Sequence, residues 1–280
     1  MHGRVIEDRA GALQTLLGHA RPGAVRRLPP AEAIGLVLAD EVCAACAVPE
    51  VASSMRDGYA LRASDIASAT TRSPVTLPLG GCLPAETELP EPLGDGRTIR
   101  VLTGAPLPPG ADCVVADERV SLISDGVVFV AHTSPGRHVR PAGMDLPLGT
   151  RIVGAGERVT PQLAAILVRA RLVQVPVFPS PTAAAFSIGN ELADPYVPSA
   201  DGRMPADNLV MTTGLLGQAG LETLRRAVLP DRVQDVVAAL TREPYPDLIV
   251  TTGGTGRSER DVARTGAELA GFTPLFGSVD

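Results

Sequence analysis

The chain has 280 residues, which is enough for two or three domains with sizeable cores. Hydrophobic residues make up 45% of it and charged residues 20%, so a disordered chain is excluded. No apolar run approaches about 20 residues, and the N-terminus lacks the apolar core of a signal peptide. We therefore expect no membrane span and a cytoplasmic protein.

The basic residues are all of one type, and the net charge is unevenly distributed along the chain. Every one of the 25 basic residues is arginine, and the net charge is −6. Residues 1–176 carry 17 arginines against 18 acids, whereas residues 177–280 carry 8 against 13. This acidic second part argues against a nucleic-acid surface, because neutralising phosphates requires clustered positive charge. It is compatible with a carboxylate-lined pocket that holds a divalent cation.

The first part of the chain predicts two helices and then a β domain. Residues 7–20 and 29–42 have apolar residues at helical spacing, and Pro29 and Pro30 stand where a first helical turn would tolerate them. Residues 47–140 are rich in Pro, Gly and Thr, with turn residues between short alternating runs, which is typical of a small all-β domain. The β-prone runs are 98–104, 111–120 and 126–133.

The second part predicts a parallel sheet covered by helices. A helix is expected at 160–172, with Thr160 as N-cap and Pro161 in its first turn. Strands are then expected to alternate with helices, which predicts βαβ units and an α/β fold class. The expected strands are 182–189, 221–230 and 246–254, and the expected helices are 205–220, 231–243 and 258–271.

The segment 247–262, DLIVTTGGTGRSERDV, has the strongest local signal for a ligand site. An apolar strand runs into glycines and small hydroxyl residues before a helix begins, and backbone N–H groups at such a helix start bind anions. Gly253, Gly254 and Gly256 would let a ligand approach the backbone, with Asp261 beside it. The alternative is a strand–helix turn that needs glycine only for its geometry.

Further acids and glycines lie on loops. Asn190 and Glu191 follow the strand 182–189 and would reach the same crevice if the two strands are neighbours; the alternative is ordinary turn and cap residues. Asp57 lies between an extended run and the β domain, and Asp145 lies in a glycine-flanked turn. Each of these is a weak signal by itself.

Together these segments resemble a known family. AEAIGLVLADEV, SSMRDGYAL, VLTGAPLPPGADCVV, RPAGMDLPLGTRIVGAGERVTPQ, SIGNEL and TTGGTGRSERD occur in that order between about residues 30 and 261. The chain is similar to the molybdopterin molybdenumtransferases of molybdenum cofactor biosynthesis, and is gephyrin E-domain-like. Six segments in the family's order are far more specific than any one of them.

The resemblance implies a modular α/β multidomain fold. Residues 1–46 and 141–176 would form an elongated helical and linker domain, 47–140 an inserted small β domain, and 177–280 a parallel-sheet α/β molybdopterin-binding domain. The family's C-terminal β domain is expected to be absent. The family also implies a homodimer in which the β domain faces the partner's α/β domain.

The implied activity is insertion of molybdate into adenylated molybdopterin with release of AMP. The resemblance implies Mg²⁺ as cofactor, held by Glu191 and Asp261, and a molybdopterin adenylyltransferase as a further partner. It also assigns catalytic roles to five acidic residues. It assigns substrate binding to Thr103 and to the glycine-rich loop that follows the strand 246–254. The catalytic residues would be Asp57, Asp145, Glu191, Asp231 and Asp261, and the binding residues Thr103, Gly253, Gly254, Thr255, Gly256 and Ser258.

Two departures from the family's pattern lead to a further expectation. Ile188 and Asn190 stand where the family has Thr and Asp, and the lysine-bearing loop that follows in the family does not occur in this sequence. We therefore expect binding of pterin and Mg²⁺ with weak molybdate insertion, with Arg257 and Arg260 as the basic residues of the glycine loop. The alternative function is a non-catalytic molybdopterin-binding protein or a scaffold.

Overall fold

The computed structural model describes residues 6–88, 90–198, 202–254 and 262–279. The chain forms two compact units, one of residues 27–176 and one of residues 1–26 with 177–280. We call them the β unit and the α/β unit. The sequence-based division into three domains stays a prediction.

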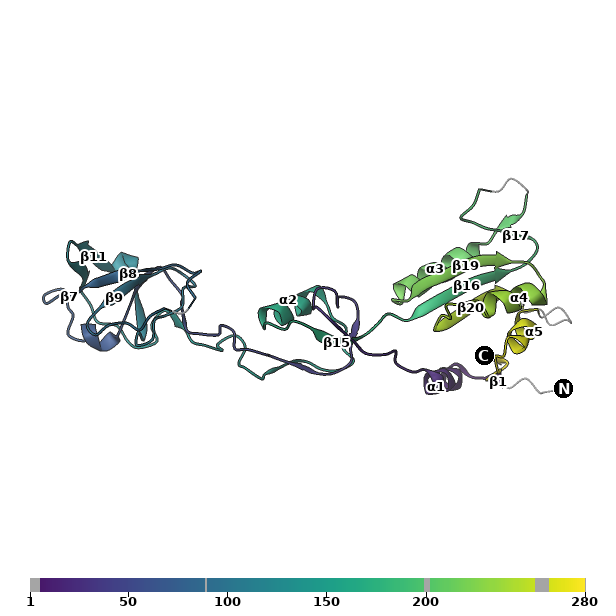
Figure 1. The fold of residues 1–280 in the computed structure, drawn as a ribbon, viewed down its shortest axis with the longest axis horizontal. Helices are drawn as coiled ribbons and strands as arrows, with labels where there is room; N and C mark the ends of the chain where they lie inside the picture. The colour runs from purple at the N-terminus through teal and green to yellow at the C-terminus, as the bar shows by residue number, and fades with distance from the viewer. Residues whose placement is uncertain (1–5, 89, 199–201, 255–261, 280) are drawn as a thin grey trace. The chain divides into compact units, whose positions relative to one another are not determined.

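The α/β unit is built on a parallel sheet of three strands in the order β19-β16-β20 (Figure 1). The central strand β16 (Thr182–Ile188) pairs in parallel with β19 (Glu222–Leu229) and with β20 (Leu248–Gly253). Helices α3 (Asp207–Gln218), α4 (Val233–Leu240) and α5 (Val262–Leu269) alternate with these strands. Parallel βαβ units are thus confirmed at the predicted places.

Burial of β16 on both faces explains its sequence. Ala183 and Ala185 pack against α3 through Leu209, whereas Phe186 packs on the other face against α4 and α5. Successive side chains of a strand point to opposite faces, so a strand covered on both faces needs a continuous apolar run. The small alanines let the helices on both faces approach the sheet closely. Gly266 of α5 likewise allows α5 to pack closely against α4.

The rest of the α/β unit is formed by short elements. Its N-terminal helix α1 (Arg9–His19) is capped by Asp8, whose side chain accepts a hydrogen bond from the Gly11 N–H, and so agrees with the helix expected at 7–20. Two pairs of short strands complete the unit. They are β1 (Ile6–Glu7) with β21 (Ser278–Val279) and β17 (Leu192–Ala193) with β18 (Met204–Pro205).

The β unit contains several small sheets. Its largest has the order β10-β6-β9-β8, and a second has the order β11-β12-β7. These strands are β6 (Gly58–Leu61), β7 (Val75–Leu77), β8 (Leu79–Leu83), β9 (Thr98–Val101), β10 (Cys113–Ala116), β11 (Val120–Ile123) and β12 (Gly126–Phe129), with 3-10 turns at Ala63–Ile66 and Asp117–Arg119.

Shorter sheets and one helix complete the β unit. The pairs are β13 with β5 and β14 with β4, and a third sheet has the order β2-β15-β3. Helix α2 (Pro161–Arg169) begins as predicted, because the Thr160 hydroxyl accepts a hydrogen bond from the Leu163 N–H at 3.1 Å. The short strands are β2 (Arg26–Leu28), β3 (Val37–Leu38), β4 (Val42–Cys43), β5 (Ser53–Ser54), β13 (Val139–Arg140), β14 (Arg151–Val153) and β15 (Val175–Phe178).

Two apolar cores fill the β unit from opposite faces of β6 and β10. Tyr59 and Leu61 belong to a core that includes Phe129, whereas Ala60 belongs to a core that includes Val101. The alternation has the period of two expected for strands with both faces covered. The predicted β domain is therefore stabilised by branched aliphatic side chains together with the buried aromatic rings of Tyr59 and Phe129.

The helix predicted at 29–42 is wrong. The chain makes one turn there, with the Ala33 N–H bonded to the Pro29 carbonyl, and Gly35 then adopts φ +89°. A left-handed residue ends a helix. The Gly35 and Leu38 N–H groups then bond to the distant carbonyls of Val159 and Glu157, so tertiary pairing replaces the second helical turn.

Candidate functional site

The carboxyl ends of β16 and β20 lie side by side in the α/β unit. In the parallel register Ile188 is opposite Gly253, so the loops that follow both strands begin at the same edge of the sheet. Open α/β sheets bind ligands at this edge. Below it, the Ser187 and Thr252 hydroxyls bond to each other at 2.7 Å, which satisfies two polar groups inside the sheet.

Glycine is required at the end of β20 by space as well as by conformation. Gly253 has φ +78°, and a Cβ on it would lie 2.2 Å from the Ile188 carbonyl oxygen. Gly254 has φ +67°, and a Cβ there would lie 3.2 Å from the Ile188 side chain and 3.3 Å from Val262. The geometry of the strand–helix turn therefore accounts for both glycines. This explanation is compatible with an additional ligand-binding role.

The loops after β16 and β19 are locked together by two reciprocal bonds. The Asn190 N–H donates to Asp231 Oδ2 at 3.0 Å, and the Asp231 N–H donates to Asn190 Oδ1 at 3.2 Å. Both residues are exposed. Asp231 is thus held at the same sheet edge as Gly253. Asn190 connects two loops and is therefore not an ordinary turn residue.

Glu191 occupies the same edge. The position that a Cβ would take on Gly189 is 2.5 Å from Glu191 Oε1, so the carboxylate folds back against the glycine backbone. The Glu191 carbonyl accepts a hydrogen bond from the Met204 N–H at 2.9 Å, which fixes the loop between β16 and β18. Among residues 6–88, 90–198, 202–254 and 262–279, no three His, Cys, Asp or Glu side chains are arranged to hold a metal ion.

The remaining predicted residues of the glycine loop lie outside the described residues. These are Thr255, Gly256, Ser258 and Asp261, together with the basic pair Arg257 and Arg260.

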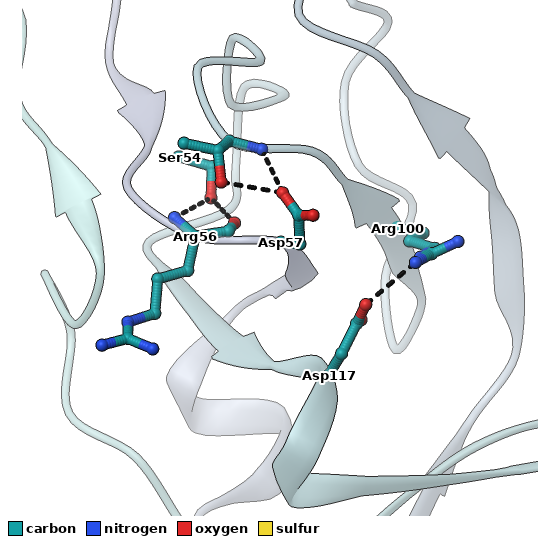
Figure 2. A network of polar contacts seen from close by, with 6 residues as sticks. Ser54, Arg56, Asp57, Arg100 and Asp117 are labelled. Carbon is teal, nitrogen blue, oxygen red and sulfur yellow. Dashed lines mark hydrogen bonds and ion pairs between the residues drawn. The ribbon is translucent and has the colours of Figure 1, made fainter.

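A second set of predicted residues meets in the β unit. The Thr103 N–H and hydroxyl both donate to Asp57 Oδ1, each at 2.7 Å (Figure 2). These two donors, the hydroxyl first, lower the pKa of Asp57 below its usual value of 3.8. Gly104, with φ +87°, closes the turn by donating its N–H to the Ser54 carbonyl. Sequence reasoning selected Asp57 and Thr103 separately, and the fold joins them.

An ion pair lies beside this carboxylate. Arg100 donates to Asp117 Oδ2 at 2.9 Å (Figure 2). The Asp117 N–H donates to the Asp57 carbonyl at 3.3 Å. Arg100 also contributes to lowering the pKa of Asp57. Sequence reasoning missed Arg100 and Asp117, because neither stands in a segment with a local functional signal.

Asp145 stands apart from both sets of contacts. Its carboxylate accepts a hydrogen bond from the Arg140 guanidinium, and its N–H donates to the Val48 carbonyl at 2.9 Å. The predicted residues thus fall into three places: Asp57 with Thr103, Asp145 with Arg140, and the edge of the parallel sheet. The roles assigned to them stay predictions.

The sequence matches two family descriptions in succession. Residues 8–170 match "MoeA N-terminal region (domain I and II)", and residues 184–279 match "Probable molybdopterin binding domain". The chain belongs to the MoeA family. The predicted resemblance to molybdopterin molybdenumtransferases is therefore confirmed.

Relatives and solved structures agree with the MoeA assignment. The chain is 31% identical over 278 residues to molybdopterin molybdenumtransferase 2 of Mycobacterium tuberculosis, covering 99% of this chain and 66% of the relative. It is 29% identical over 247 residues to the Bacillus subtilis molybdopterin molybdenumtransferase, covering 86% of this chain and 57% of the relative. The chain thus spans less than two thirds of the length of these MoeA relatives.

Among solved structures, two of a molybdopterin biosynthesis MoeA protein from Pyrococcus horikoshii are similar to this chain. One superposes with a TM-score of 0.82 at 26% identity, over 94% of this chain and 66% of that one. The other has a TM-score of 0.74 at 28% identity, over 89% and 66%. The predicted fold class, with small β sheets and a parallel-sheet α/β domain, is confirmed. No helix in the described part of the chain is long and apolar enough to cross a membrane.

Proposed function

We propose that this MoeA-family chain acts as a molybdopterin molybdenumtransferase, inserting molybdate into adenylated molybdopterin with release of AMP. The observation that carries the proposal is the match of residues 8–170 and then 184–279 to consecutive parts of the family. The predicted acids of the β unit and of the α/β unit both stand on loops that fixed hydrogen bonds hold in place.

The pterin substrate is proposed to bind at the edge formed by β16 and β20. Gly253 and Gly254 expose backbone there, and residues 255–261 would continue the loop with Thr255, Gly256 and Ser258. Backbone N–H groups at the start of a helix suit the phosphate of the substrate. The family match over 184–279 supports this placement.

Mg²⁺ is proposed to bind Glu191 and Asp261. Carboxylate oxygens are the ligands that this ion prefers, and it commonly takes one or two of them together with substrate phosphates. The Glu191 carboxylate, folded against Gly189, stands at the sheet edge where the phosphate is expected. When bound, the ion neutralises phosphate charge. Asp231, braced by Asn190, would hold a proton donor of the substrate at the same edge.

Asp57 is proposed to orient water or a pterin N–H donor. Its low pKa keeps it ionised at neutral pH, and the two Thr103 donors fix the carboxylate so that its other oxygen can accept a hydrogen bond from either group. Asp145, oriented by Arg140, is proposed to hold pterin N–H donors.

We further propose that the protein is a cytoplasmic homodimer that receives adenylated molybdopterin from an adenylyltransferase. Light scattering tests the dimer, for which a mass of twice that of the monomer is expected.

Calorimetry with molybdopterin tests the binding step. Gly254→Val should abolish binding, because its side chain would meet Ile188 and Val262 in a left-handed conformation. Gly271→Val is the matched control: Gly271 also has a positive φ, of +93°, but lies after α5. Unchanged affinity in a folded Gly254→Val protein would refute the site.

Turnover separates the enzyme from the alternative, a non-catalytic molybdopterin-binding protein or scaffold. The chain is given adenylated molybdopterin, Mg²⁺ and molybdate, and activation of an apo-molybdoenzyme is measured. Weak insertion is expected, since Asp57, Glu191 and Asp261 would repel the oxyanion. Binding without any turnover would support the alternative. Turnover that disappears in Arg257→Ala or Arg260→Ala would assign those arginines to molybdate.

A further inference from the structure

A concave pocket lies in the β unit between β10 and the segment 131–138. One wall is formed by Val114, Val115 and Ala116 of β10, and the polar lining consists of Arg119, His132, Thr133, Arg137 and His138. Every polar side chain that lines it is therefore a cation, an imidazole or a hydroxyl. Among the described residues that line the pocket, none is acidic.

Positive charge converges on His138. Burial lowers the pKa of this imidazole, and Arg137 lowers it further through its charge, as Arg56 and Arg119 do to a smaller extent. Three guanidiniums from separate parts of the β unit thus act on one ring. Glu118 lies 3.9 Å from the Arg56 guanidinium, but both side chains are largely exposed, so this pair offsets little of the field.

The backbone beneath these side chains is fixed. His138 has φ +54°, a conformation that non-glycine residues rarely adopt. It is held there because its carbonyl accepts a bond from the Met55 N–H at 2.9 Å, and the neighbouring Arg137 carbonyl accepts one from Val114 at 2.9 Å. The His138 Nδ1 is 3.2 Å from the Val114 carbonyl, which requires Nδ1 to be the donor. Nε2 is then the nitrogen that gains a proton when the ring is charged.

We propose that this pocket binds a tetrahedral oxyanion, either a free oxyanion or the phosphate of a nucleotide. Guanidinium groups form paired hydrogen bonds to such anions, and Thr133 and a protonated His138 add single donors. The proposal does not depend on the proposed function. Ala116, which lines the pocket, pairs with Gly58, the residue that follows Asp57, so the pocket and the Asp57–Thr103 contact belong to neighbouring strands of the same unit.

Calorimetry on the full chain tests the pocket, with inorganic phosphate, molybdate and AMP as separate probes. The double variant Arg119→Ala, Arg137→Ala should weaken binding by about tenfold or more, since each lost bond is charge-assisted. Arg72→Ala is the matched control, an exposed arginine of the same unit outside the pocket. Tighter binding of AMP than of phosphate identifies a nucleotide as the occupant, and equal binding identifies a free oxyanion. Undiminished binding in the double variant overturns the proposal.

The pH dependence tests the part played by His138. An anion favours the protonated ring, so with molybdate as the probe, which keeps its charge over this range, affinity should rise as the pH is lowered from about 8 to about 6. His138→Asn removes the titrating group while keeping a residue type that tolerates positive φ, and it should remove this rise. An equal rise in the variant would overturn the role of His138. The loss caused by the double variant Arg119→Ala, Arg137→Ala should be the same in the Gly254→Val background, which keeps this result distinct from a failure of the pterin site.

Discussion

Each unit contains a threonine that donates two hydrogen bonds to one aspartate oxygen, and the two aspartates differ in their relation to the proposed site. In the β unit, the Thr103 N–H and hydroxyl donate to one oxygen of Asp57, both at 2.7 Å. In the α/β unit, the Thr182 N–H and hydroxyl donate to one oxygen of Asp247, at 2.7 and 2.8 Å. Each aspartate directly precedes a strand, β6 in one case and β20 in the other.

The difference lies in where the two pairs stand. Asp247 joins the amino ends of β16 and β20, opposite to the edge where Gly253 ends its strand, and its own N–H returns a bond to Thr182 Oγ at 3.1 Å. Ligands bind at the other edge of such sheets, so this pair serves the fold. Asp57 lies on a loop of the predicted family segment. Bond geometry alone therefore does not distinguish a catalytic carboxylate from a structural one.

The largest expected effect is on turnover. Asp57→Asn should lower molybdate insertion by about 10- to 100-fold, as expected for loss of a charged hydrogen-bond acceptor that orients a reacting group. Asp247→Asn should leave turnover within about twofold, because that end of the sheet has no proposed contact with substrate. The measurement is activation of an apo-molybdoenzyme by each purified variant. Equal losses in both variants would remove the functional difference between the two pairs.

The largest expected effect on the free energy of unfolding comes from a substitution at Gly253, at the carboxyl end of β20. Gly253→Ala should destabilise the α/β unit by about 2–4 kcal/mol, since its Cβ would overlap the Ile188 carbonyl in addition to the cost of a left-handed residue. Gly271→Ala, where a Cβ has nothing within 4 Å, should cost only about 1–2 kcal/mol. Urea unfolding followed by circular dichroism measures both. A cost for Gly253→Ala no greater than that for the control would contradict the described packing.

Removing one hydroxyl from each pair should sharpen the comparison. Thr182→Val should lower the free energy of unfolding by about 0.5–1 kcal/mol, a value reduced by the exposure of Asp247. Thr103→Val should instead lower turnover, because Asp57 loses one of the two donors that orient its carboxylate. Urea unfolding and turnover are measured on both variants. A Thr103→Val protein with full turnover would limit Thr103 to a structural role.

The smallest effect concerns acid stability. The Thr182 N–H, and then its hydroxyl, lower the pKa of Asp247 below its usual value of 3.8. A carboxyl with a lowered pKa in the folded state stabilises the protein above its unfolded pKa, and this contribution is lost as the pH falls through the folded pKa. Asp247→Asn should therefore lose more stability at pH 7 than at about pH 3. Urea midpoints at both pH values measure this, and an equal loss at both would contradict the shift.

The sequence by itself determined the elements whose signals are local. Thr160 and Pro161 mark the start of α2, and the apolar run 182–189 predicts a buried strand, because caps and periodicity depend only on near neighbours. The helix predicted at 29–42 failed, since Gly35 and the distant Glu157 carbonyl decide that segment. The order of the family segments was enough to select Asp57, Thr103 and Gly253 as candidate site residues, and their roles stay predictions.

Only the tertiary structure decided which of these residues meet. Thr103 is 46 residues from Asp57, and Asn190 is 41 residues from Asp231, so no local pattern connects either pair. The cationic pocket at His138 likewise arises from guanidiniums that are scattered along the chain. Hydrogen bonds and charges act through space, whereas propensity and capping act along the chain, and for that reason the elements could be predicted more fully than the contacts between them.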